Sequence, residues 1–149
     1  MTEKRPATLL RRLAAMLYDS LLVMALLFLA TIPFVAVRGG EAVEPGTSPA
    51  YTLGLVLVLY LFFVGFWTSR GRTLGMQSWG LQLEDTEGRV PGPLKASIRF
   101  AAAILSAVPF GLGFLWQLVD RDKLTWHDRL SGTRLVHYPR PSKRKGKAA

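Results

Sequence analysis

The chain has 149 residues, enough for one domain, and it has no cysteine, which excludes disulfides, thiol catalysis and cysteine-based metal sites. Half of the residues are hydrophobic and the mean hydropathy is +0.24, which is high for a soluble chain of this length. The formal net charge of +9 indicates an anionic partner, either an anionic lipid surface or nucleic acid.

The apolar residues are gathered in three blocks, and most charges lie between them. The first block, 13–37, carries one charge, Asp19, whereas the second, 51–68, and the third, 100–119, carry none. Each approaches the ~20 residues that a helix needs to cross a bilayer. A signal peptide is a poor interpretation of the first block, because its apolar run exceeds the ~7–15 residues of such segments and an acid interrupts its start. The sequence therefore predicts an integral membrane protein.

The distribution of lysine and arginine predicts the orientation of the first two blocks. Basic residues precede the first block, whereas the connection over 38–50 has a single arginine beside two glutamates. We therefore expect the N-terminus (residues 1–10) in the cytoplasm, the connection outside, and residues 69–99 again in the cytoplasm.

The third block creates a conflict with this distribution. A full crossing would place the following tail outside, although that tail holds nine of the 19 basic residues. Pro109, Gly111 and Gly113 interrupt the block near its middle, so two helical halves, 99–108 and 111–119, could enter and return where the broken backbone is buried in protein. We favour such a re-entrant or bent pair with both ends in the cytoplasm; a straight third span is the alternative.

The loop after the second block predicts a small cytoplasmic β-hairpin. Residues 79–84 alternate weakly in polarity and Asp85-Thr-Glu-Gly88 has the composition of a turn. Residues 133–138 are a further strand candidate that could pair with the first. We expect an all-α membrane protein with two transmembrane helices, a third bent or re-entrant hydrophobic helical segment, and this hairpin.

The expected membrane domain covers residues 11–138. Its spans lie at about 13–37 and 51–68, and its re-entrant or third span at about 99–119. Residues 139–149 are predicted to be a disordered basic tail, because they combine lysine, arginine, proline and glycine without apolar residues of any size.

Asp19 is the first candidate site residue. It follows Arg12 by seven residues, so the two share one face of a helix to within about 20°, with Asp19 about two turns into the membrane. An acid at that depth costs ~2.5–3.5 kcal/mol unless it is paired, hydrated or protonated. Two interpretations stay open: an ion or proton site, or the buried partner of an arginine, with Arg99 as the best candidate.

Residues 124–133 predict a short helix at the membrane surface, which Thr125 could cap. Asp128 would then point toward basic residues at the cytoplasmic lip, among them Arg12 and Arg99.

His127 lies beside Asp128, but with His137 it makes too small a ligand set for a metal site. We interpret His127 as a polar surface histidine and expect neither a metal nor a cofactor.

Several motifs in order resemble the RDD family of bacterial membrane proteins, which is named for one arginine and two aspartates. Arg12-Leu-Ala-Ala-Met-Leu-Tyr-Asp19 is similar to the family's opening motif R-x-x-A-x-x-x-D. Arg72-Thr-Leu-Gly75 and Gly80-Leu-Gln-Leu-Glu-Asp85 are similar to its central stretch, and His127-Asp-Arg-Leu-Ser-Gly-Thr133 to its closing motif H-D-R-x-A-G-T. Together these motifs cover roughly residues 8–137.

The resemblance implies that Arg12, Asp19 and Asp128 are the defining trio and that the protein is a multi-pass protein of the bacterial cell (inner) membrane. A transport role has been suggested for the family. With Arg99, which matches an arginine before the family's last apolar block, the trio would form either an ion or proton site or a buried ion-pair network.

Two functions are therefore open as hypotheses. The first is a small transporter or ion/proton exchanger, homo-oligomeric because two and a half spans enclose too little volume for a pathway. The second is a non-transporting membrane scaffold or regulator, whose cytoplasmic face binds anionic lipid or protein. We expect no enzyme, because no nucleophile and base converge at one depth. We also expect no nucleic acid, because the basic tail has no interleaved aromatic residues.

Overall fold

The computed structural model describes residues 4–43, 46 and 48–138. The predicted basic tail, residues 139–149, lies outside the described residues.

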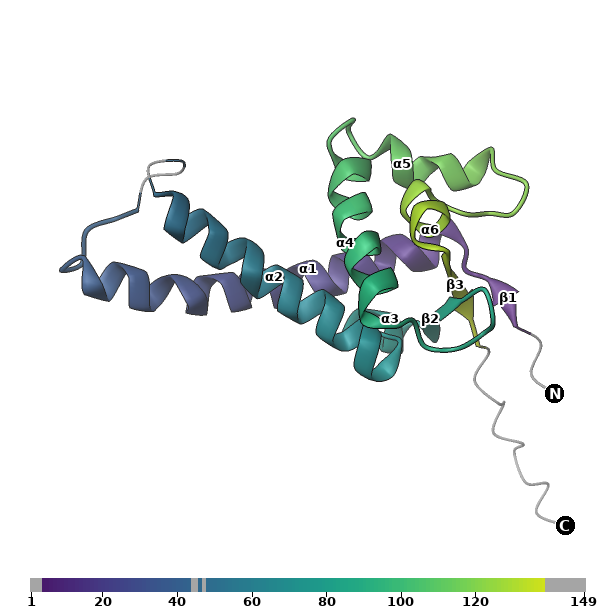
Figure 1. Cartoon of the computed structure of the whole chain (residues 1–149), viewed down its shortest axis with the longest axis horizontal. Helices are drawn as coiled ribbons and strands as arrows, with labels where there is room; N and C mark the ends of the chain where they lie inside the picture. The colour runs from purple at the N-terminus through teal and green to yellow at the C-terminus, as the bar shows by residue number, and fades with distance from the viewer. Residues whose placement is uncertain (1–3, 44–45, 47, 139–149) are drawn as a thin grey trace, which may run out of the picture.

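Two long helices, α1 (Leu9–Val37) and α2 (Pro49–Arg70), lie side by side and project from the rest of the molecule (Figure 1). Both are long enough and apolar enough to cross a membrane, as the sequence predicts. Near their far ends Thr31 Oγ1 lies 2.9 Å from the hydroxyl of Tyr51, and the rings of Phe34 and Tyr51 are 5.2 Å apart. The pair is therefore held together by polar and aromatic contacts along an otherwise apolar surface.

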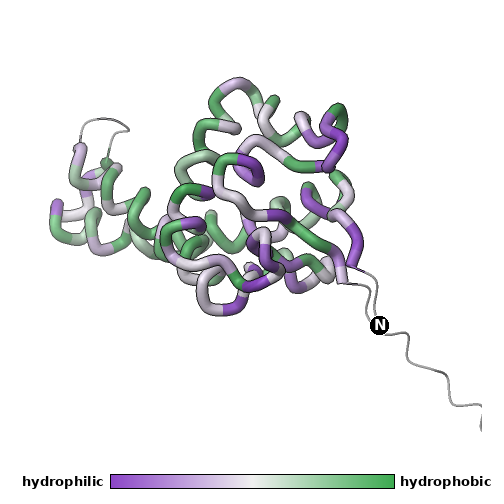
Figure 2. The backbone as a smooth tube through the Cα atoms, turned by 45° about the vertical axis from the view of Figure 1, so that its right-hand side comes forward, coloured by the Kyte–Doolittle hydropathy of each residue, from purple (hydrophilic) through white to green (hydrophobic). Residues whose placement is uncertain are grey.

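The remaining elements pack around the first turns of α1 and the last turns of α2. We call this part, residues 4–19 and 60–138, the compact end; hydrophilic stretches run through it (Figure 2). Its further helices are α3 (Leu74–Ser78), α4 (Pro93–Ala107), α5 (Leu112–Leu115), the 3-10 helix η1 (Trp116–Leu118) and α6 (Trp126–Ser131).

Three short strands form an antiparallel sheet in the order β1-β3-β2, from β1 (Arg5–Pro6), β2 (Leu81–Asp85) and β3 (Thr133–His137). The predicted pairing of the two longer strands is confirmed, with Leu83 opposite Leu135.

The predicted local hairpin is wrong, although its turn forms, with Gly88 N donating to Asp85 O at 3.1 Å. The chain after this turn does not return as a strand. Pro91 has no N–H to donate to a sheet, and Pro93 begins α4 at a first-turn position that suits proline. The fold is therefore mostly helical with a three-stranded sheet, and β1, only two residues long, escaped the sequence pattern.

The third apolar block is broken where the sequence predicts. The helical pair α4 and α5–η1 is bent by 109°, and Phe110 and Gly111 in the turn both have positive φ. The two arms touch closely: a Cβ on Gly113 would lie 2.5 Å from Cβ of Ser106. No straight helix runs through residues 99–119.

The interior of the compact end is unusually polar. Among the described residues, 14 buried side chains are polar or charged and 11 are hydrophobic. Soluble domains bury mainly apolar residues, and charged groups are seldom buried in them unless paired. Here most of the large apolar side chains lie outside, many of them on the surfaces of α1, α2, α4 and α5. This arrangement suits a surrounding medium that is itself apolar.

We expect Gly113→Ala to lower the stability of the protein, because the new methyl group overlaps Ser106 and must push α5 away from α4. Overpacking of this kind costs about 1–3 kcal/mol. Gly65→Ala in α2 is the matched control, since a Cβ added at Gly65 would meet nothing within 4 Å. Thermal unfolding of the three proteins in detergent, followed by circular dichroism, measures the difference; equal melting temperatures for Gly113→Ala and wild type would contradict the close contact.

Candidate functional site

Asp128 is fixed in place by its own short helix. Thr125 is the N-cap of α6: its Oγ1 accepts a hydrogen bond from Asp128 N at 3.3 Å, and Asp128 Oδ2 accepts one from Thr125 N at 3.2 Å. This reciprocal pair satisfies N–H groups that a helix start leaves without partners. Gly132, with φ +61°, ends the helix. The capping predicted at Thr125 is confirmed.

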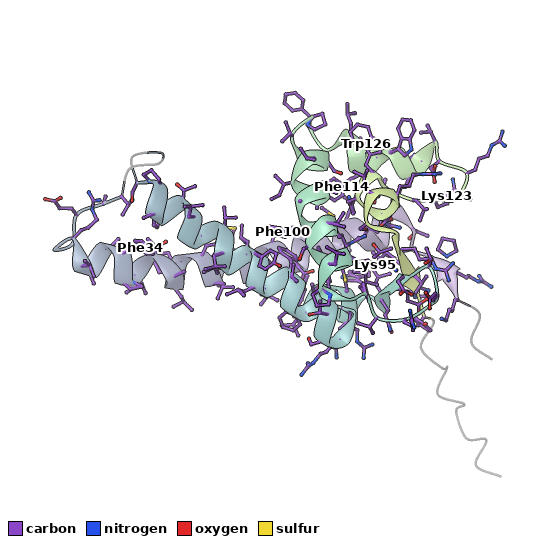
Figure 3. The ribbon with its side chains drawn as sticks, in the orientation of Figure 1. Phe34, Lys95, Phe100, Phe114, Lys123 and Trp126 are labelled. Carbon is purple, nitrogen blue, oxygen red and sulfur yellow. The ribbon has the colours of Figure 1, made fainter. Side chains whose placement is uncertain are left out.

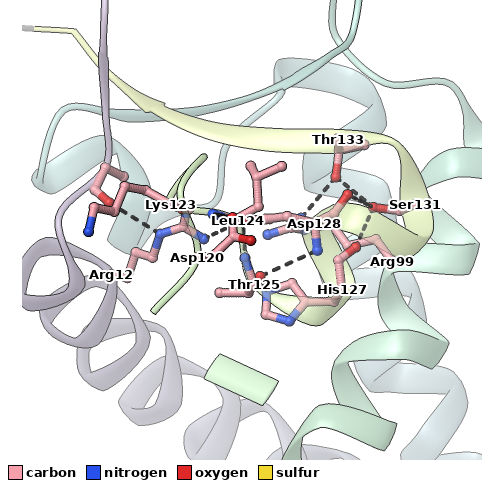
Figure 4. A network of polar contacts seen from close by, with 11 residues as sticks. Arg12, Arg99, Asp120, Lys123, Leu124, Thr125, His127, Asp128, Ser131 and Thr133 are labelled. Atoms are coloured by element: carbon pink, nitrogen blue, oxygen red, sulfur yellow. Dashed lines mark hydrogen bonds and ion pairs between the residues drawn. The ribbon is translucent and has the colours of Figure 1, made fainter. Parts of the chain in front are cut away.

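Two arginines from different helices bind this one carboxylate (Figure 4). Arg12 in α1 donates from Nη1 to Asp128 Oδ2 at 2.7 Å, and Arg99 in α4 donates from Nη1 to Oδ1 at 2.5 Å. The arginines are 5 % and 3 % exposed, and Asp128 is 1 % exposed. We call these three residues the Asp128 cluster. It joins α1, α4 and α6, which are far apart in the sequence.

The two guanidinium groups have further neighbours. Arg99 also donates to Thr133 Oγ1 at 2.9 Å and lies over the ring of Trp67, 5.3 Å from its centre. Arg12 donates from Nε to the carbonyl of Ala7 at 3.4 Å. These contacts partly compensate the cost of burying two cations beside one anion. Even so, the Asp128 cluster carries one net positive charge.

The charges of the cluster determine the protonation of Asp128. Burial alone raises the pKa of its carboxyl, but the guanidinium groups of Arg99 and Arg12 outweigh burial and hold the pKa well below its usual value. Asp128 is therefore an anion at any physiological pH.

His127 is buried, at 4 % exposed, so its prediction as a surface histidine is wrong. Its Nε2 lies 2.9 Å from Thr125 Oγ1, and its ring packs on Phe114 with centres 4.7 Å apart. Burial, and then the positive charge of Arg99, lower the pKa of His127 to about 3. The imidazole is therefore neutral and acts as part of the packing beneath α5.

Asp19 does not join the Asp128 cluster. Its Oδ2 accepts a hydrogen bond from Thr73 Oγ1, and its Oδ1 accepts one from Gly75 N at 2.9 Å. Of the two interpretations of Asp19, the pair with Arg99 is wrong, because Arg99 is bound to Asp128 instead. Asp19 thus helps to cap α3, whose N-cap residue is Thr73.

The close approach of α3 to α1 depends on a glycine. A Cβ on Gly75 would lie 2.3 Å from the carbonyl oxygen of Ala15 and 2.8 Å from Cγ of Asp19. Only a residue without a side chain allows its amide to reach the carboxylate there. Thr73, Gly75 and Thr133 were not singled out as site residues from the sequence; the available signal was that they stand inside the motifs of the RDD resemblance.

Arg12 and Asp19 share one face of α1, as predicted, but serve two different contacts. Seven residues separate them by roughly 10 Å along the axis. Arg12 therefore reaches α6, whereas Asp19, about two turns further along α1, reaches α3.

Within the part of the chain that the structure describes, no group of three or more histidine, aspartate or glutamate residues could hold a metal ion.

We expect Asp128→Asn to be strongly destabilising, because it leaves two buried guanidinium groups without an anion. Breaking a buried pair by removing one partner costs roughly 3–5 kcal/mol. The matched control is Asp122→Asn, at an exposed aspartate whose side chain lies 3.2 Å from Arg129, where a loss of at most about 1 kcal/mol is expected. Similar melting temperatures of the two variants in detergent would show that the cluster does not hold the fold.

We also expect the protein to lose stability as the pH falls below 6.5. The unfolded chain then binds a proton at His127, whereas the folded chain, with a pKa of about 3, does not. The difference amounts to about 2 kcal/mol between pH 7 and pH 5. Near pH 4 the lowered pKa of Asp128 adds a second loss in the same direction.

The control for this pH dependence is His127→Gln, which keeps a polar group beside Thr125 but does not titrate. Melting temperatures of both proteins between pH 7 and pH 5 should fall more steeply for wild type. If the melting temperatures of both proteins fall equally with pH, the imidazole of His127 is in contact with solvent in the folded protein.

Comparison with known proteins identifies the family of the chain. The model of the RDD family matches residues 6–132, a range that includes Arg12, Asp19, Arg99 and Asp128. No curated relative and no solved structure matches the chain. The family match covers most of the chain from β1 to the end of α6, and the protein therefore belongs to the RDD family.

Proposed function

We propose that this RDD-family protein is a non-transporting scaffold of the bacterial cell membrane. In this proposal α1 and α2 cross the bilayer, and the compact end lies at the cytoplasmic side of the membrane, where it binds anionic lipid head groups. Family membership and the two apolar helices fit an integral membrane protein. The observation that supports the scaffold proposal is that the carboxylates of Asp19 and Asp128 both bind partners within the chain and so hold helices together.

Asp19 supports a structural role because both of its carboxylate oxygens have partners within the chain. It is 4 % exposed, so an ion would have to displace Thr73 or Gly75 to reach it. A shallow pocket of about 270 Å³ opens nearby between α1 and α3, but Asp19 does not line it. Its lining residues are Tyr18, Leu22, Leu74, Gln77 and Ser78.

The Asp128 cluster supports the same conclusion through its charge. Two guanidinium groups share one carboxylate, so the cluster has a net positive charge, which opposes the binding of a cation or a proton. The arginines and Asp128 are buried among α1, α4 and α6.

The basic residues support the cytoplasmic position of the compact end. Among the described residues, Arg38 is the one lysine or arginine at the far end of the α1–α2 pair, and the others belong to the compact end. This distribution matches the positive-inside rule with the N-terminus and β3 in the cytoplasm. Each basic residue near an anionic membrane contributes about 1 kcal/mol of attraction. Exposed basic side chains include Arg70, Arg72, Arg121, Lys123 and Arg134.

Transport by a homo-oligomer is the competing proposal. Its support is the largely exposed apolar surface of α1 and α2, which further copies of the chain could cover to build a pathway between them. The two proposals differ in whether ions or protons move through the reconstituted protein.

The test is flux into liposomes of phosphatidylglycerol and phosphatidylcholine that contain wild type, Asp19→Asn or Asp122→Asn. Asparagine at position 19 keeps an oxygen for Gly75 N, so this variant should remain folded. For a scaffold, we expect cation and proton flux no higher than in protein-free liposomes for all three proteins. Wild-type flux that is lost in folded Asp19→Asn, and kept in Asp122→Asn, would overturn the proposal in favour of transport.

A second measurement addresses the lipid that the scaffold binds. Native mass spectrometry of the protein with equal amounts of the two lipids should show preferential retention of phosphatidylglycerol. The double variant Arg70→Gln/Arg72→Gln should weaken that preference, because both side chains are exposed at the end of α2. Equal retention of both lipids would remove anionic lipid as the ligand.

A further inference from the structure

The outer face of α4 is an uninterrupted apolar stripe. Successive members are spaced by four or three residues, so they lie along one side of the helix. All are exposed, with Leu94 at 75 %, Leu105 at 64 % and Val108 at 74 %. We call this set the α4 stripe; its members are Leu94, Ile98, Ala101, Leu105 and Val108.

The opposite face of α4 carries residues that are small or polar. Ala96, Arg99, Ala102 and Ser106 are buried against the compact end. A surface helix of a soluble protein turns its apolar side to the core and its polar side to water. Helix α4 does the reverse, which places an apolar medium on its outer side.

The apolar surface continues around the turn into α5 and η1. Phe110, in the turn, is fully exposed, and every exposed residue from Ile98 to Val119 is apolar. Charged residues resume directly afterwards at Asp120 and Arg121. The two arms together therefore present an apolar surface with a charged border.

Helix α4 runs across the direction of the α1–α2 pair (Figure 1). Its contacts with α2 lie in the second half of that helix: Tyr60 Oη is 2.7 Å from Ser97 Oγ, and the rings of Tyr60 and Phe100 are 5.5 Å apart. Phe100 projects from α4 toward α2 (Figure 3). At the start of α4, Lys95 donates to Asp85 in β2 at 3.4 Å. Contacts with α2 and with β2 therefore hold α4 across the direction of the α1–α2 pair.

We propose that α4 and its turn into α5 form an in-plane membrane anchor, with the α4 stripe and Phe110 embedded among the lipid acyl chains of the cytoplasmic leaflet. This inference rests on the proposed function, in which α1 and α2 cross the bilayer. A helix that runs across the spans lies along the membrane plane, and its outer face adjoins the lipid-facing surface of α2. The anchor enters one leaflet and does not cross.

Lipid fits this surface better than a second copy of the chain. Helices that pack together in membranes meet through small residues, which allow close approach. On α4 the small residues Ala96, Ala102 and Ser106 face inward, and four of the five members of the α4 stripe on the outer face are large. Trp116 and Trp126, with ring centres 6.0 Å apart, lie at the border where charges resume, a position that tryptophan favours at membrane interfaces.

Single-cysteine variants test the anchor, because the chain has no cysteine and a spin label therefore reacts at one site. The label is placed at Leu94→Cys, Leu105→Cys or Phe110→Cys, with Phe28→Cys in the second half of α1 and Lys123→Cys beyond the border. Electron paramagnetic resonance in liposomes compares collision with oxygen, which enters lipid, and with a water-soluble nickel chelate.

The comparison of Leu94 with Leu105 distinguishes an in-plane helix from a crossing one. The sites are 11 residues apart, which is roughly 16 Å along a helix axis. We expect both labels in lipid at depths that agree within about 5 Å, about 5–10 Å below the head groups. Phe110→Cys should be in lipid as well, and Lys123→Cys in water.

Three results would overturn the anchor. Depths at Leu94 and Leu105 that differ by most of their separation would show a crossing or re-entrant helix. Labels shielded from both reagents, with dipolar broadening between copies, would show that a second chain covers the stripe. Labels at all three sites in water would exclude membrane contact. The label at Phe28 tests the proposed function separately. If it too lies in water, α1 does not span the membrane. If it lies in lipid while the labels on the α4 stripe and at Phe110 lie in water, the anchor alone is rejected.

Discussion

The ion pairing of one buried carboxylate with two guanidinium groups is the interaction on which the rest of the structure depends. Asp128 is held by the cap of α6, and it binds Arg12 of α1 and Arg99 of α4. Because a buried charge without a partner is far more costly than a paired one, each of these helices can occupy only the position that completes the cluster. The position of α4 across the long helices, and of the sheet that follows α6, depends on this constraint.

A polar interior of this kind has a physical reason in an apolar environment. Within a bilayer, apolar side chains gain little by leaving lipid for the protein interior, so hydrophobic burial contributes little to helix association. Hydrogen bonds, ion pairs and close contacts of small residues must position the helices instead. Asp19 with Thr73, and Gly113 against Ser106, are contacts of these two kinds. Most large apolar residues remain outside, where they contact lipid in the proposed arrangement.

The two defining aspartates of this RDD protein thus have different partners and similar roles. Asp19 accepts N–H and O–H groups at the start of α3, and Asp128 accepts N–H groups from two arginines. Both contacts involve the same face of α1, because Asp19 and Arg12, which binds Asp128, are seven residues apart. Helix α1 therefore joins the α1–α2 pair to α3 and to α6. A scaffold requires this kind of connection, and a transport site would require one of the carboxylates to be released.

The sequence by itself determined the features that depend on local pattern: two helices of spanning length, the break at Pro109–Gly113, the Thr125 cap and the two longer strands. The predicted approach of Asp128 to Arg12 and Arg99 is also confirmed. Only the tertiary structure decided the other contacts. Arg99 binds Asp128 and not Asp19, His127 is buried, and β1 joins the sheet in place of a local hairpin. Periodicity and capping act within a few residues, whereas these pairings depend on how α4 crosses the long helices. That crossing depends on contacts of α4 with α2 and β2, residues far apart in the sequence.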